Sequence, residues 1–101
     1  MIVEYTRYRI PEDRRAAFEK AYQDAAQYLQ NSPHCLGYEL THCTEETDRY
    51  ILRIQWKSID EHLHGFRTEP GFKEFFRLVQ PFIHDIEEMQ HYERTAVVHD
   101  V

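Results

Sequence analysis

The sequence predicts an α+β domain in which helices cover one face of a four-stranded antiparallel sheet. Four segments alternate large apolar with polar residues, as half-buried strands do, and the regions between them space apolar residues as helices do. The order strand, helix, strand, strand, helix, strand is the ferredoxin-like βαββαβ arrangement. Because 101 residues suffice for one compact core, we expect a single domain over residues 1–98 and a frayed tail over 99–101.

The first half of the chain predicts a strand, a helix and a hairpin. Residues 2–10 alternate β-branched and aromatic side chains with polar ones, which is typical of a strand. Residues 12–30 place their apolar side chains on one helical face. Residues 36–43 alternate again, and the polar turn 44–48 joins them to a third strand, Arg49–Trp56. So short a link predicts antiparallel pairing of these two strands.

The second half predicts two short helices and a last strand. Ser58 and Glu61 have the spacing of a capping box, so a helix is expected over residues 58–66. Pro70 suits the first turn of a second helix over Pro70–Val79. Residues 86–98 resume the alternation of a strand.

Composition restricts the classes of function. The formal net charge is −6 and the basic residues form no cluster, so a nucleic-acid partner is not expected. No apolar run is long enough to span a membrane, which predicts a cytoplasmic protein with no membrane partner. Cys35 and Cys43 are expected to be reduced thiols. The seven histidines lack the close spacing of zinc ligands, so we predict no metal and no cofactor.

The face of the sheet that the helices leave uncovered is the predicted partner surface. It carries Val3, Tyr5, Ile51 and, depending on the register, Met89 or Tyr92. A large apolar and aromatic surface on so small a domain is typical of an association site. We therefore expect a homodimer in which two chains stack through their open sheet faces.

Five segments spread over nearly the whole chain carry a family resemblance. They read VEYTRYRIPEDR, SPHCLGYEL, RYILRIQWKS, FKEFFRLVQPFI and EEMQHYE, and the likeness is strongest around the strand that ends in Trp-x-Ser. The chain resembles the antibiotic-biosynthesis-monooxygenase-like family of dimeric α+β barrels. This resemblance implies a cofactor-independent monooxygenase with a pocket between sheet and helices. There an electron-rich aromatic or quinol-type compound reduces O₂ directly, and the protein orients and desolvates it.

The resemblance also implies the walls of that pocket. Trp56, the only tryptophan, falls on the family's pocket tryptophan, although the residue pattern alone equally allows a purely structural core residue. Three aromatic residues of the following helix are expected to line the pocket with it: Phe72, Phe75 and Phe76.

Polar groups for the chemistry come from the first strand and the helix after Trp56. Strand parity places Glu4, Thr6 and Tyr8 on one face, which by the resemblance looks toward the helices. Thr6 or Tyr8 could hydrogen-bond a phenolic oxygen. Glu4 could act as the base if burial raised its pKa, its alternative being a solvated or ion-paired carboxylate. His62 and His64 are the other candidate bases, each alternatively a surface residue.

Two other functions stay open on the sequence. A non-catalytic dimer that binds a small ligand or a partner is one, because no motif has a spacing that demands chemistry. A haem-binding or haem-degrading protein is the other. Relatives of that branch carry a first-strand asparagine and an iron-ligating histidine on the last helix, where this chain has Thr6 and Phe76. Phe76 cannot ligate iron, and His84 follows the break at Pro81.

Overall fold

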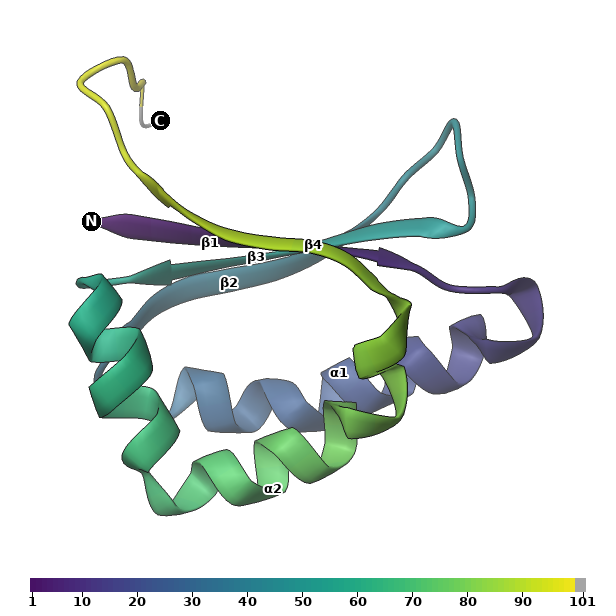
Figure 1. Ribbon diagram of the computed structural model, residues 1–101, viewed down its shortest axis with the longest axis horizontal. Coiled ribbons are helices and arrows are strands. Elements are labelled where there is room, and N and C mark those ends of the chain that lie inside the picture. The colour runs from purple at the N-terminus through teal and green to yellow at the C-terminus, as the bar shows by residue number, and fades with distance from the viewer. Residues whose placement is uncertain (100–101) are drawn as a thin grey trace.

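A computed structural model of the protein describes residues 1–99, which form a four-stranded sheet with helices on one face (Figure 1). The strands follow the order β2, β3, β1, β4 across the sheet, and every neighbouring pair is antiparallel. Their bounds are β1 (Ile2–Arg9), β2 (Cys35–His42), β3 (Arg49–Trp56) and β4 (Ile86–Glu93). The predicted ferredoxin-like α+β arrangement is confirmed.

The covering layer consists of two α-helices and several short helical turns, all on the same side of the sheet (Figure 1). The long helix α1 (Arg15–Gln30) buries Phe18, Tyr22, Ala25 and Leu29, whose three-and-four spacing gives one apolar face. The helices are α1 (Arg15–Gln30) and α2 (Pro70–Val79), and the turns are Glu12–Arg14, Glu61–Gly65, Phe66–Thr68 and Gln80–Asp85.

The segment between β3 and α2 differs from the prediction. The helix expected over residues 58–66 is largely a π-helical turn, Glu61–Gly65. Ser58 starts it as predicted, because its Oγ accepts a hydrogen bond from the Glu61 backbone N–H at 3.0 Å. The Glu61 carboxylate does not complete a capping box; it pairs instead with Nδ1 of His34. That contact ties the turn to the chain just before β2.

The last strand is shorter than predicted: β4 ends at Glu93, whereas alternation suggested residue 98. The reason lies in its neighbour. The backbone N–H of Arg94 still donates to the Met1 carbonyl at 3.2 Å, but β1 begins at Ile2 and offers no further partner. The following residues therefore leave the sheet (Figure 1). Of the tail expected over 99–101, residues 100 and 101 lie outside the described residues.

The pairing of β1 with β4 decides which residue of β4 faces away from the helices. Tyr92 lies on the open face, where its ring contacts that of Tyr5 edge to face with centroids 5.4 Å apart. Met89 is paired with Thr6 and lies on the side that the helices cover. The open face therefore carries Tyr92 rather than Met89.

Two composition-based expectations concern the thiols and membranes. Cys35 and Cys43 are both free, as predicted. Burial raises the pKa of the Cys35 thiol, which disfavours the reactive thiolate. Within residues 1–99, no helix has the length and apolar character needed to cross a membrane.

Candidate functional site

A cavity of about 310 Å³ lies between the sheet and α2, large enough for a small aromatic molecule. Its apolar wall includes Ile54, Phe66, Phe72, Phe75, Phe76 and Met89. Its polar groups come from Glu4, Thr6, Tyr8, Tyr22, His62 and Arg67. A mostly aromatic wall with a few converging polar groups is typical of a ligand site.

The buried end of the cavity is built on β1. Because side chains alternate along a strand, Glu4, Thr6 and Tyr8 share the face that looks toward the helices. All three are buried, and Glu4 is only 3% exposed. A carboxylate is rarely buried to this extent without partners that compensate its charge.

Glu4 has such partners on both carboxylate oxygens. The indole Nε1–H of Trp56 donates to Oε1 at 3.0 Å, and the Thr6 hydroxyl donates to Oε2 at 3.0 Å. Burial raises the pKa of Glu4 above its ordinary 4.5, and these two hydrogen bonds oppose that rise because they stabilise the ionised form. Glu4 is thus a buried carboxyl group whose orientation is fixed by its hydrogen bonds.

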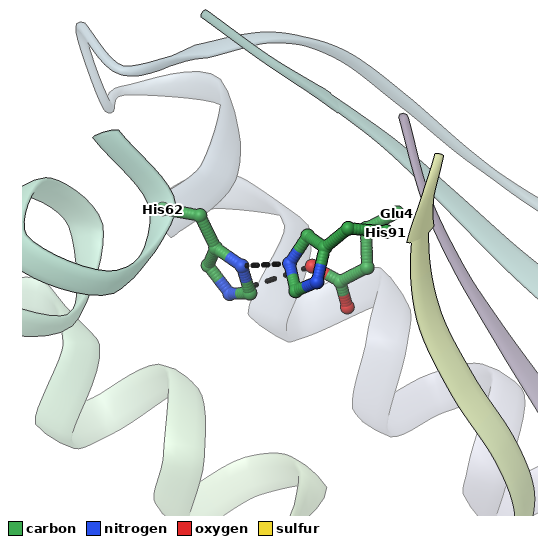
Figure 2. A group of neighbouring side chains, drawn as sticks. All are labelled: Glu4, His62 and His91. Carbon is green, nitrogen blue, oxygen red and sulfur yellow. Dashed lines mark hydrogen bonds and ion pairs between the residues drawn. The ribbon is translucent and has the colours of Figure 1, made fainter. Parts of the chain in front are cut away.

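Two imidazoles extend this network (Figure 2). The His62 ring stacks on Trp56 with centroids 4.5 Å apart, and its Nε2 lies 3.4 Å from Glu4 Oε1. Its Nδ1 lies 2.7 Å from Nε2 of His91, which comes from β4. Burial, assisted by the charges of Arg67 and His91, lowers the pKa of His62 to about 4. His62 is therefore neutral at neutral pH.

His91 is the residue of this group that the sequence analysis missed. It lies directly opposite Glu4 in the register of β1 and β4. The alternation of β4 puts His91 on the same face as Met89. Whether that face looks toward the helices depends on the register between the first and last strands, which the sequence does not show. Tyr22 was missed for another reason: its helical spacing marked it as core, yet its hydroxyl reaches that of Tyr8.

The Tyr8 hydroxyl is predicted to hydrogen-bond a ligand and here pairs with the Tyr22 hydroxyl. Burial raises the pKa of Tyr8 to about 12, and that of Tyr22 well above its usual 10.0. Both phenols therefore stay protonated, and since one hydroxyl donates to the other, the pair has one O–H left to donate to an anionic oxygen in the cavity.

Trp56 has features of both alternatives expected for it. Its side chain is fully buried, packs on Phe66 and also lines the cavity. The tryptophan is thus a core residue with one edge on the site. Phe72, Phe75 and Phe76 line the cavity as expected, and Phe76, 40% exposed, lies at its rim.

The structure does not bring His64 to the site. Its side chain is 74% exposed and pairs with Asp60 at 2.7 Å on the surface of the helical turn. His62, two residues earlier, takes the inward position, because side chains two apart on a helix point in different directions. His84 is likewise not among the described residues that line the cavity, so no imidazole takes the place of Phe76 there.

Comparison with known proteins assigns the chain to a family. The family model for antibiotic biosynthesis monooxygenase matches residues 1–78, well over half of the chain. The chain belongs to the antibiotic biosynthesis monooxygenase family. Among sequence relatives, the uncharacterized protein YczJ of Bacillus subtilis (strain 168) is 27% identical over 93 residues, which cover 92% of this chain and 98% of YczJ.

Solved structures share the fold of this family member. A proposed antibiotic biosynthesis monooxygenase from Bordetella bronchiseptica matches with a TM-score of 0.75 and 26% identity, over 93% of this chain and 96% of that one. One from Chloroflexus aurantiacus J-10-fl gives a TM-score of 0.76 at 16% identity, covering 97% and 96%. At 16% identity, the structure from Chloroflexus aurantiacus shows a likeness of fold alone. The match to the family model confirms the family resemblance read from the sequence.

One group in this antibiotic biosynthesis monooxygenase homologue could hold a metal ion. Glu4, His62 and His91 each offer one donor atom, and these atoms all lie within 4.8 Å of one another. Two imidazoles and a carboxylate form a ligand set that suits zinc and other first-row transition metals. Spacing along the chain gives no sign of this group, because its ligands come from β1, β4 and the helical turn between β3 and α2.

The lowered pKa of His62 predicts a specific acid sensitivity of the metal-free protein. Unfolded His62 binds a proton below its ordinary pKa of 6.5, whereas the folded protein does so only below about 4. The free energy of unfolding is therefore highest above pH 6.5, where His62 is neutral in both states. It falls by up to about 3 kcal/mol as the pH drops to 4. Urea unfolding of wild type and His62→Gln over this range measures the difference. Equal pH slopes in the two proteins would refute the prediction.

Proposed function

We propose that this protein is a monooxygenase of electron-rich aromatic or quinol-type compounds whose oxygenation step draws its electrons from the substrate. The observation that carries the proposal is the aromatic-walled cavity with the buried Glu4 carboxylate at its inner end. Membership of the antibiotic biosynthesis monooxygenase family supports the same general activity. The cavity volume of about 310 Å³ favours a compact ring system.

The chemistry begins with proton removal. Glu4 accepts a proton from the acidic C–H or O–H of the bound ring, leaving a carbanion or phenolate. That anion reduces O₂, and a bond forms between a ring carbon and one oxygen atom. For an anthrone, the CH₂ group becomes C=O, two C–H bonds break, and the second oxygen atom leaves as water. The substrate supplies all four electrons, so the balance needs no other reductant.

Other cavity residues have supporting roles in this scheme. Arg67, whose charge acts on Glu4, attracts the anion, and the remaining O–H of the Tyr8–Tyr22 pair donates to its oxygen. Water exclusion by the aromatic wall strengthens these interactions. His62 and His91 then offer the proton on Glu4 a path toward the surface, since His91 is only partly buried.

Oxygen uptake tests the proposal directly. Metal-stripped protein is mixed with a panel of hydroquinones and anthrones in air-saturated buffer, and uptake and product masses are recorded. We expect at least one compound to be consumed faster than without protein, giving a product that has gained oxygen. Uptake no faster than the uncatalysed rate across the panel would contradict the oxygenase.

A binding module is the second candidate function, and one observation favours it. Both oxygens of Glu4 already accept hydrogen bonds from the protein, which is what a structural carboxylate would do. Fluorescence of the sole tryptophan reports on this alternative, because Trp56 lines the cavity. Saturable quenching by a ring compound that is never oxygenated would favour the binding module.

The open sheet face is proposed to pair with a second copy of the chain. Tyr92 is 44% exposed beside Tyr5, which is the kind of aromatic surface that a partner covers. We expect light scattering to give the mass of two chains for wild type and of one chain for Tyr92→Glu, because a buried, unpaired carboxylate opposes association. A wild-type mass of one chain at micromolar concentration would contradict the dimer.

A further inference from the structure

We propose that Glu4, His62 and His91 form a binding site for a divalent transition-metal ion at the inner end of the cavity. The three side chains come from β1, β4 and the helical turn Glu61–Gly65, and all point toward one common spot (Figure 2). Nitrogen and carboxylate ligands of this kind suit zinc, cobalt and iron. The inference goes beyond the proposed oxygenase activity and does not require it.

The distances within the group are close to those of a metal site. Two ligand atoms on one tetrahedral ion, each about 2.0–2.1 Å from it, lie about 3.3 Å apart. Glu4 Oε1 and His62 Nε2 are 3.4 Å apart, which already corresponds to this spacing. The donor atom of His91 lies within 4.8 Å of the other two, and its ring is only partly buried.

The surroundings hold the ligands in place, as they do in established metal sites. The Trp56 N–H and the Thr6 hydroxyl bind the two oxygens of Glu4, and the Trp56 ring stacks on His62 at an interplanar angle of 9°. Hydrogen-bonded carboxylates and oriented imidazoles of this type raise metal affinity. In the metal-free protein Nδ1 of His62 is within hydrogen-bond distance of Nε2 of His91, at 2.7 Å, which holds the two rings together.

With three protein ligands, a tetrahedral ion would keep one coordination position open toward the cavity. Glu4 and His62 both line the cavity, so a water molecule or an oxygen of a bound ring would take the remaining position. Glu4 contributes one negative charge, and Arg67 lies close enough to act on it, so an anionic oxygen such as a phenolate would balance the ion best. Cation binding and proton acceptance are therefore alternative states of the same carboxylate.

Cobalt titration tests the site without substrate. Chelator-treated, dialysed protein is titrated with Co²⁺, and its visible d–d absorption is followed. We expect wild type to bind one ion per chain, and Glu4→Gln and His91→Gln to bind it at least about 100-fold more weakly. The matched control is His64→Gln, which removes an exposed imidazole outside the cavity and should bind as wild type does. Binding that survives in His91→Gln, or none in wild type, would overturn the proposal.

The wild-type protein decides the question if these variants fail to fold. Nuclear magnetic resonance of the imidazole rings, recorded with and without Zn²⁺, is expected to shift the signals of His62 and His91 and leave that of His64 unchanged. Shifts confined to exposed histidines would overturn the site. Because neither measurement uses oxygen or substrate, loss of the oxygenase proposal leaves this one standing, and the converse also holds.

Discussion

Replacing Glu4 with glutamine is expected to lower the oxygenation rate constant kcat of the metal-free protein by about 10²–10⁴-fold, the usual contribution of a general base. Glutamine is the same size, accepts the Trp56 N–H and can donate to the Thr6 hydroxyl. The hydrogen bonds that hold the side chain therefore persist in another form. What disappears is the capacity to take a proton from the bound ring.

Ligand affinity separates this effect from damage to the cavity. Quenching of Trp56 fluorescence should give a similar Kd in wild type and Glu4→Gln, whereas steady-state oxygen uptake should differ greatly. The matched control is Glu88→Gln on β4, whose carboxylate forms an exposed ion pair with Arg7 at 3.8 Å. This control should keep the wild-type rate. If the Glu4→Gln variant were as active as wild type, Glu4 would not be the base.

Replacing Trp56 with phenylalanine is expected to destabilise the fold by about 2–4 kcal/mol. Part of that loss comes from the space left by a smaller ring at a fully buried position. The other part comes from the hydrogen bond to Glu4, because losing a donor to a buried carboxylate costs about 1.5–3 kcal/mol. The same loss raises the pKa of Glu4 further, since the indole N–H stabilises its ionised form.

A double-mutant cycle between Trp56→Phe and Glu4→Gln measures the coupling of the two side chains. Urea unfolding of wild type, both single variants and the double variant gives the coupling free energy, which we expect to be about 1 kcal/mol in favour of the wild-type pair, because glutamine still accepts the indole N–H and only the extra strength of a bond to a charged group is lost. Additive effects would show that the indole N–H binds the charged carboxylate no more strongly than it binds the neutral amide.

The sequence was sufficient for the parts of the structure that depend on local patterns. Alternation located β3 at Arg49–Trp56 and helical spacing with Pro70 located α2, both with the observed bounds. The end of β4 was wrong by five residues because it depends on where β1 begins, a property of the partner strand. A strand continues only as far as its neighbour can pair with it.

For the same reason, only part of the candidate site could be predicted from the sequence. Parity along one strand correctly grouped Glu4, Thr6 and Tyr8 on the inner face. His91 joins them through the pairing of the first and last strands, and its spacing from His62 gives no local signal. His64 was included because it is near Trp56 in the sequence, yet the turn of the helix directs it to solvent.

Isotope labelling in a single turnover tests the central claim most directly, namely that the cavity around Glu4 and Trp56 oxygenates its ligand with electrons from that ligand. Metal-stripped protein is mixed under ¹⁸O₂ with the hydroquinone or anthrone that it binds best, and the mass of the product is measured by mass spectrometry. The account predicts one heavy oxygen atom in the product and the other in water, with labelling at least about 100-fold slower in Glu4→Gln. A product without label, or labelling at the same rate in both proteins, would contradict it.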